Sequence, residues 1–120
     1  ADALVRGRKP NPTELVMLIL HQVHNLEERN MRPFESFARE ELLPGVAAQP
    51  DARLIWYASA TDVETRGREA ITMIALENAS ALSRFCDRLQ DGDLASVGRK
   101  MQSLRSGVET RLSKEMVYTL

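Results

Sequence analysis

The chain has 120 residues, a formal net charge of −1 and 43% hydrophobic residues, enough for one domain with its own core. Acidic and basic residues are mixed along the chain with no basic stripe, which argues against nucleic-acid binding. The single cysteine, Cys86, excludes an internal disulfide and a cysteine-based metal cluster and fits a reducing compartment. No apolar run approaches the about 20 residues of a membrane span. We therefore expect a cytoplasmic protein without a membrane partner.

The N-terminal part of the chain predicts an arm followed by a strand. Residues 1–13 are polar and contain two prolines, which is typical of a flexible arm, so we expect a single domain over 14–120. The unbroken apolar run Leu15–Leu20 predicts a first strand over about 14–24 that is apolar on both faces. A polar connection over 25–30 follows.

A first helix and a hairpin occupy the middle of the chain. From Met31 onward, apolar residues recur at three- and four-residue spacing, and Pro33 suits the first turn of a helix. The pair Pro44–Gly45 is expected to break or kink this helix. Two strands then follow over about 52–61 and 68–76, joined by a polar loop that ends in glycine, as in a β-hairpin.

The C-terminal third predicts a second helical region and a last strand. Asn78 or Ser80 is placed to cap a helix whose apolar side includes Phe85, and we expect Cys86 to pack on that side. The sequence Asp91–Gly92–Asp93 interrupts the helix, and an amphipathic piece continues to Ser106–Gly107. A fourth strand is expected within 108–120.

This order of elements predicts a ferredoxin-like α+β fold, β-α-β-β-α-β, with a four-stranded antiparallel sheet. Right-handed crossovers put both helical regions on one face of that sheet. The other face would expose an apolar set on several strands, more than a monomer normally tolerates. A second copy packed against this face would cover it, so we expect a homodimer that associates through the sheet.

Several segments of the chain are similar to a known superfamily. They are His21–Val23 at the end of the first strand, Arg32–Ala38 in the helix, Ala52–Trp56 in the second strand and Ile74–Asn78 before the second helix. With the order of elements, they make the chain resemble the dimeric α+β barrel superfamily, which includes antibiotic-biosynthesis monooxygenase-like and NIPSNAP-like proteins. The chain departs from the family at Asp51–Ala52, where the small barrel families often have a glycine pair.

The resemblance implies a small-molecule enzyme or binder, for example a monooxygenase-like protein that acts without metal or organic cofactor on a planar apolar substrate. The alternative that we keep open is a non-catalytic dimerisation or ligand-sensing domain of unknown function. A shared fold does not choose between these functions.

Four residues are candidates for such a site. His21 could act as a general base, because the pKa of an imidazole lies near neutral pH. Trp56 could stack on a planar ligand, its neighbour Tyr57 could offer its hydroxyl to a carbonyl or phenolate, and Arg53 could pair with a substrate carboxylate. Each also has a purely structural interpretation, as core or as a solvent-facing strand end. His24, three residues after His21, should face the opposite side of the strand, so we expect no shared metal site.

Overall fold

Four antiparallel strands form one sheet in the computed structural model, which describes residues 14–61 and 67–118. The order across the sheet is β2-β3-β1-β4. The strands are β1 (Glu14–Leu26), β2 (Ala52–Thr61), β3 (Arg68–Leu76) and β4 (Gly107–Tyr118). The bounds predicted for the second and third strands are confirmed, whereas the first strand continues two residues further than predicted. The arm predicted over 1–13 lies outside the described residues.

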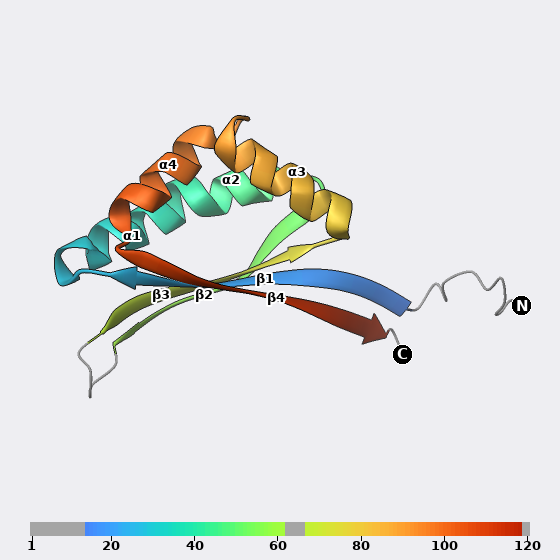
Figure 1. The fold of residues 1–120 in the computed structure, drawn as a ribbon, viewed down its shortest axis with the longest axis horizontal. Coiled ribbons are helices and arrows are strands. Elements are labelled where there is room, and N and C mark those ends of the chain that lie inside the picture. Colours follow the sequence, from blue (N-terminus) through green and yellow to red (C-terminus); the bar gives the residue numbers. More distant parts are fainter. Residues whose placement is uncertain (1–13, 62–66, 119–120) are drawn as a thin grey trace, which may run out of the picture.

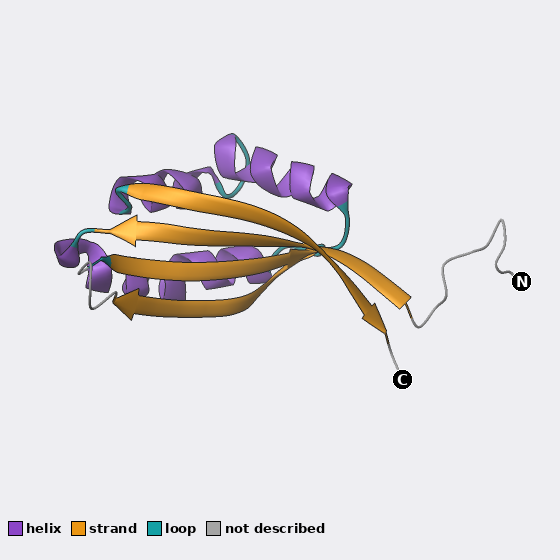
Figure 2. Ribbon diagram, turned by 60° about the horizontal axis from the view of Figure 1, so that its bottom comes forward, coloured by secondary structure: helices purple, strands orange, loops and turns teal. Residues whose placement is uncertain are grey.

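All the helices of the described residues lie on one face of this sheet, and within those residues the opposite face carries none (Figure 1). They are η1 (Glu28–Asn30), α1 (Met31–Phe37), η2 (Ala38–Leu42), α2 (Leu43–Ala47), α3 (Ala79–Gln90) and α4 (Ala95–Leu104). The predicted ferredoxin-like order β-α-β-β-α-β is confirmed, with each helical region divided into shorter pieces. Figure 2 shows the helices behind the sheet, with its uncovered face, here called the open face, toward the viewer.

The first helix was predicted to break or kink at Pro44–Gly45, and the break is wrong because helical winding continues to Ala47. Proline lacks the N–H that a helix interior requires. Here η2 is a π-helical turn that directly precedes α2, and Pro44 occupies one of the first two positions of α2. The winding therefore changes just before the proline, which then stands where the missing N–H costs least.

The hydrophobic core lies between the helices and the sheet. Its largest fully buried apolar side chains are Phe34, Phe37, Leu42, Val46, Leu76 and Phe85. The predicted cap of α3 is confirmed, since Asn78 Oδ1 accepts a hydrogen bond from the Ala81 N–H at 2.9 Å. The expectation that Cys86 is buried is wrong: it is exposed, because it follows the buried Phe85 on the helix and turns out of the apolar stripe.

Candidate functional site

The two faces of the sheet separate the residues of β1. Leu20 and Leu26 belong to the core beneath the helices, and His24 is also buried on this side, against the ring of Phe34. Because side chains alternate along a strand, Ile19 and His21 lie on the open face. The prediction that His21 and His24 face opposite sides is therefore confirmed.

A β-bulge in β2 decides how Trp56 and Tyr57 are oriented. Leu54 is opposite Ile74 of β3, but Trp56 is opposite the next residue along, Met73, so Ile55 is the extra residue. Trp56 consequently lies on the open face, where its side chain is 56% exposed. Tyr57 packs against the core on the helix side. The two aromatic side chains face opposite ways, as predicted.

One row of directly opposed residues crosses the open face. Trp56 is opposite Met73, Met73 is opposite His21, and His21 is opposite Arg111 of β4. Arg53 lies on the same face, opposite Ala75. Three of the predicted site residues, His21, Arg53 and Trp56, thus share the open face, and Tyr57 lies on the other side of the sheet.

Tyr57 lines a cavity of about 230 Å³ between the helices and the edge strand β2. The lining residues are Glu35, Ala38, Arg39, Leu43, Leu54 and Tyr57. They come from α1, the π-helical turn η2, the start of α2, and β2. The change of winding at η2 therefore lies directly in the cavity wall, as π-helical turns often do at functional sites. No pattern in the sequence other than Pro44 itself indicates this turn.

The Tyr57 phenol in this cavity is protonated at neutral pH, and its surroundings favour that form. Burial raises its pKa above the ordinary value, the Glu35 carboxylate raises it further, and the Arg39 guanidinium opposes the effect. Both charged side chains are exposed, whereas Ala38 is buried and Leu54 is half-buried. The cavity therefore offers apolar walls, one neutral hydroxyl that can donate a hydrogen bond, and a carboxylate and a guanidinium at its solvent side.

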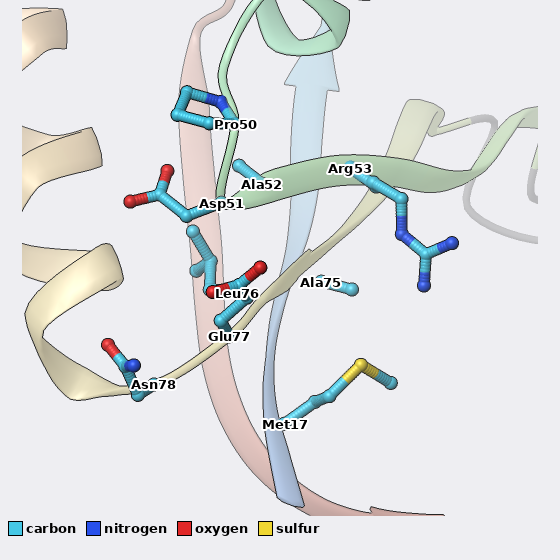
Figure 3. Close-up of a pocket in the computed structure, with 9 residues that line it drawn as sticks. All are labelled: Met17, Pro50, Asp51, Ala52, Arg53, Ala75, Leu76, Glu77 and Asn78. Carbon is cyan, nitrogen blue, oxygen red and sulfur yellow. The ribbon is translucent and has the colours of Figure 1, made fainter. Parts of the chain in front are cut away.

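A larger hollow of about 430 Å³ lies where β2 begins and β3 ends (Figure 3). Arg53, Ala75 and Met17 lie on one side of it, and Asp51 and Asn78 are on the side nearer the helices. Because the hollow spans the end of the sheet, its lining residues are divided between the two faces. Of the predicted site residues, Arg53 alone belongs to it.

The buried Asp51 carboxylate of this hollow is already paired. Its Oδ2 accepts hydrogen bonds from Arg84 Nε at 3.0 Å and from Arg84 Nη2 at 2.6 Å, and Arg88 Nη1 lies 3.5 Å from Oδ1. The hydrogen bonds from Arg84 lower the pKa of Asp51, against the effect of burial. The carboxylate therefore joins α3 to the start of β2 and is not available as a catalytic base.

His24, which was not among the predicted site residues, is a buried polar group. Its Nδ1 lies 3.0 Å from Arg105 Nη1, and its Nε2 lies 2.9 Å from Thr72 Oγ1. A guanidinium can only donate, so Nδ1 accepts, and the proton sits on Nε2, which donates to Thr72. Burial lowers the pKa of His24 to about 4, and the nearby Arg105 charge contributes. His24 is thus a neutral structural group between β1, β3 and the start of β4.

Within the described part of the chain, no cluster of three or more His, Cys, Asp or Glu side chains is arranged to hold a metal ion. None of the helices described is long and apolar enough to cross a membrane.

No protein-family model matches the sequence, and no curated protein matches it. Several solved structures match the fold of the chain. A NIPSNAP family protein from Agrobacterium tumefaciens has a TM-score of 0.59 at 15% identity, over 86% of both chains. A putative antibiotic biosynthesis monooxygenase from Deinococcus radiodurans has a TM-score of 0.53 at 10% identity, over 82% of this chain and 89% of that one.

A monooxygenase from Streptomyces coelicolor, solved in complex with the ligand nanaomycin D, has a TM-score of 0.52 at 11% identity, over 88% of both chains. Identities this low show a common fold and leave the activity undetermined. The chain therefore has the ferredoxin-like fold of the NIPSNAP and antibiotic-biosynthesis monooxygenase-like proteins, as its resemblance to the dimeric α+β barrel superfamily predicted.

Proposed function

We propose that the protein is a homodimeric barrel that binds a small, planar, apolar molecule in the cavity lined by Tyr57. The observation that carries the proposal is the composition of this cavity. Its walls include Ala38, Leu43 and Leu54, and its half-buried phenol is held neutral. Ligand sites commonly combine apolar walls with a few polar groups that fix orientation.

The cavity also limits the class of ligand. Its volume of about 230 Å³ is below the roughly 300–1,000 Å³ typical of sites for drug-sized molecules. An apolar ring system fits the walls, and a carbonyl or phenolate oxygen on it would accept the Tyr57 hydrogen bond. Arg39 and Glu35 at the solvent side would favour a polar substituent there.

The chemistry proposed for such a ligand is monooxygenase-like and needs no resident cofactor. A base removes an acidic C–H or phenolic proton, and the resulting anion reduces O₂. For a ring methylene, the balanced change is CH₂ + O₂ → C=O + H₂O, with O₂ as the oxidant. Glu35 is the carboxylate that lines the cavity. The predicted base His21 and the predicted ligand groups Trp56 and Arg53 could serve only a molecule on the open face.

The homodimer is part of this proposal, with a second copy covering the open face. On that face Val23, Ile71 and Met73 are half-buried and Trp56 is exposed, whereas Ile19 and Ala75 are already buried. Four strands about 4.8 Å apart and about 30 Å long cover roughly 600 Å² per copy. Two such faces together exceed the approximately 1,000 Å² expected of a specific interface. The cytoplasmic location stays a prediction.

A titration with 1-naphthol, a planar probe with one oxygen, tests the binding site. We expect saturable binding, weakened about fivefold by Tyr57→Phe, because a neutral hydrogen bond contributes about 1 kcal/mol. Trp56→Phe is the matched control, since it alters the adjacent aromatic residue on the other face. Weaker binding in Trp56→Phe with no change in Tyr57→Phe would place the ligand on the open face and refute the cavity as the site.

Oxygen uptake separates the two functions that remain. Consumption of O₂ in proportion to 1-naphthol, recorded with an oxygen electrode, would support the monooxygenase-like reaction. Saturable binding of 1-naphthol without O₂ consumption would favour the alternative, a non-catalytic ligand-sensing or dimerisation domain.

A further inference from the structure

Two opposite charges stand at the solvent side of the Tyr57 cavity without pairing with each other. Glu35 lies in α1, and Arg39 lies four positions later, in the π-helical turn η2. A glutamate four residues before an arginine favours an ion pair on a regular α-helix. Here the winding changes between them, and among the described residues no hydrogen bond or ion pair reaches either charged group.

The arginines in partly buried surroundings elsewhere in the molecule already have partners. Arg84 and Arg88 donate to the Asp51 carboxylate, and Arg105 donates to the imidazole of His24. A guanidinium carries five N–H donors and no acceptor. Those of the arginine in the cavity wall are therefore left to solvent or to a ligand.

The charge of Arg39 acts at the phenol of the cavity. It opposes the rise in the pKa of Tyr57 that burial and the Glu35 carboxylate cause, so the three polar groups lie close enough to act on one small molecule. Leu43 and Leu54 supply apolar surface in the same cavity. A ligand that used every group would have a ring, a hydrogen-bond donor, an acceptor and a negative charge.

We infer that the Tyr57 cavity selects a hydroxylated aromatic carboxylate and that Arg39 binds the carboxylate group. The inference rests on the proposed function and names the chemical class of its ligand. A guanidinium fits a carboxylate with two parallel N–H···O bonds. A ring hydroxyl has one donor and two acceptor positions, so it can donate to Glu35 and accept from Tyr57 at the same time.

A neutral or a cationic ring would fit the site less well. A neutral ring gains little from the charge of Arg39. An ammonium group could pair with Glu35, but it would then lie near a second positive charge. Arg53, which the sequence predicts as the partner of a substrate carboxylate, lies on the open face, on the other side of the sheet from Tyr57. It therefore cannot bind the carboxylate of a molecule in this cavity.

Paired titrations test the inference. The probe 4-hydroxy-1-naphthoate is 1-naphthol with one added carboxylate, and 4-hydroxy-1-naphthamide is its uncharged counterpart. We expect the wild-type protein to bind the carboxylate about tenfold more tightly than the amide, because hydrogen bonds between charged groups are stronger than neutral ones. In Arg39→Gln the two molecules should bind within about twofold of each other. Arg39→Lys, which keeps the charge but not the planar fork, should retain a smaller preference.

Two further variants control for charge and for position. Arg99→Gln removes the same charge from the exposed surface of α4 and should leave the preference for the carboxylate unchanged. Arg53→Gln removes it from the open face. If the preference is lost in Arg53→Gln and kept in Arg39→Gln, the carboxylate binds on the open face and the inference is wrong.

The outcomes distinguish this inference from the proposed function. If 1-naphthol binds in a manner that depends on Tyr57, but the carboxylate binds no more tightly than the amide, the inference is overturned and the proposed function stands. A preference that survives Arg39→Gln, or that Arg99→Gln abolishes equally, would also overturn it. A preference lost only in Arg39→Gln supports the inference whether or not O₂ is consumed. Failure of all three molecules to bind would overturn both.

Discussion

His24 and Thr72 join the two central strands of the sheet inside the core, with 2.9 Å between the imidazole Nε2 and the hydroxyl Oγ1. The two residues are 48 positions apart in the sequence, and both side chains are almost completely buried. Arg105 donates to the other imidazole nitrogen, so the ring is satisfied only in its neutral form. Burial and the Arg105 charge lower the pKa of His24 to about 4.

This environment predicts an acid-sensitive fold. In the unfolded chain, His24 has a pKa of about 6.5, so below that value the unfolded state binds the proton more readily than the folded state. The contribution of His24 to stability is complete above about pH 6.5 and is lost as the pH falls toward 4. The loss approaches about 3 kcal/mol. Urea unfolding from pH 7 to pH 4 measures it.

His24→Asn is the control for that pH dependence. It removes the titrating ring, so its free energy of unfolding should be lower at pH 7 but should change less between pH 7 and pH 4. An equal pH dependence in wild type and His24→Asn would contradict the assignment and would point to the carboxylates instead.

Thr72 tests the same contact from the other side. Thr72→Val keeps the shape of the side chain but leaves the buried Nε2–H of His24 without its acceptor. We expect a loss of about 1–3 kcal/mol in the free energy of unfolding. Thr72→Ser, which keeps the hydroxyl and loses a methyl group, should cost only about 1 kcal/mol. A larger loss in Thr72→Ser than in Thr72→Val would mean that packing, and not the hydrogen bond, matters at this position.

The fold could be predicted from the sequence because its signals are local. The two hairpin strands contain the largely apolar runs Leu54–Ala58 and Ile71–Leu76, a glycine ends their loop, and Asn78 precedes an amphipathic helix that it caps. The helix through Pro44 was missed because sequence patterns assume regular α-helical winding, and a π-helical turn changes the winding without a clear signature. Cys86 was misplaced because one position on a helix rotates a side chain by about 100°.

The candidate site was less predictable because it depends on long-range contacts. Alternation along a strand shows that Trp56 and Tyr57 face opposite ways, but only the bulge at Ile55 determines which of them faces the helices. The burial of His24 depends on Arg105, which is 81 positions away in the sequence. A histidine near the end of a strand carries no sign of such a partner.

Two helix glycines offer a matched test of the packing around α4. A Cβ at Gly98 would lie 2.4 Å from the backbone oxygen of Leu89, which cannot move without shifting α3. Gly98→Ala should therefore cost about 1–3 kcal/mol in the free energy of unfolding. A Cβ at Gly45 would meet only side-chain atoms, the end of the Leu94 side chain at 3.0 Å and Val97 Cγ2 at 3.8 Å.

Gly45→Ala is the comparison variant for Gly98→Ala. The gain of about 0.5–1 kcal/mol from replacing a helix glycine should offset the small displacement of Leu94. We expect thermal or urea unfolding to separate the two variants clearly, with Gly45→Ala close to wild type. Equal destabilisation of both would show that the close approach at Leu89 is not the controlling contact.

The open face gives the last prediction, which concerns association. Met73 is central in the row that joins Trp56 to His21. Met73→Glu would place one carboxylate per subunit between the two sheets of the proposed dimer, opposite the imidazole of His21. Because removing a charge from water costs several kcal/mol even beside a polar neighbour, the dissociation constant should rise at least about 100-fold.

Light scattering behind a sizing column, over a range of concentrations, measures this change in dissociation constant. Ser103→Glu adds the same charge to the exposed surface of α4, outside the proposed interface, and should remain dimeric. If Met73→Glu is as dimeric as Ser103→Glu, a second copy does not cover the open face. Met73 would then lie where water or a cation reaches it, because a carboxylate at the centre of the open face is tolerated only there.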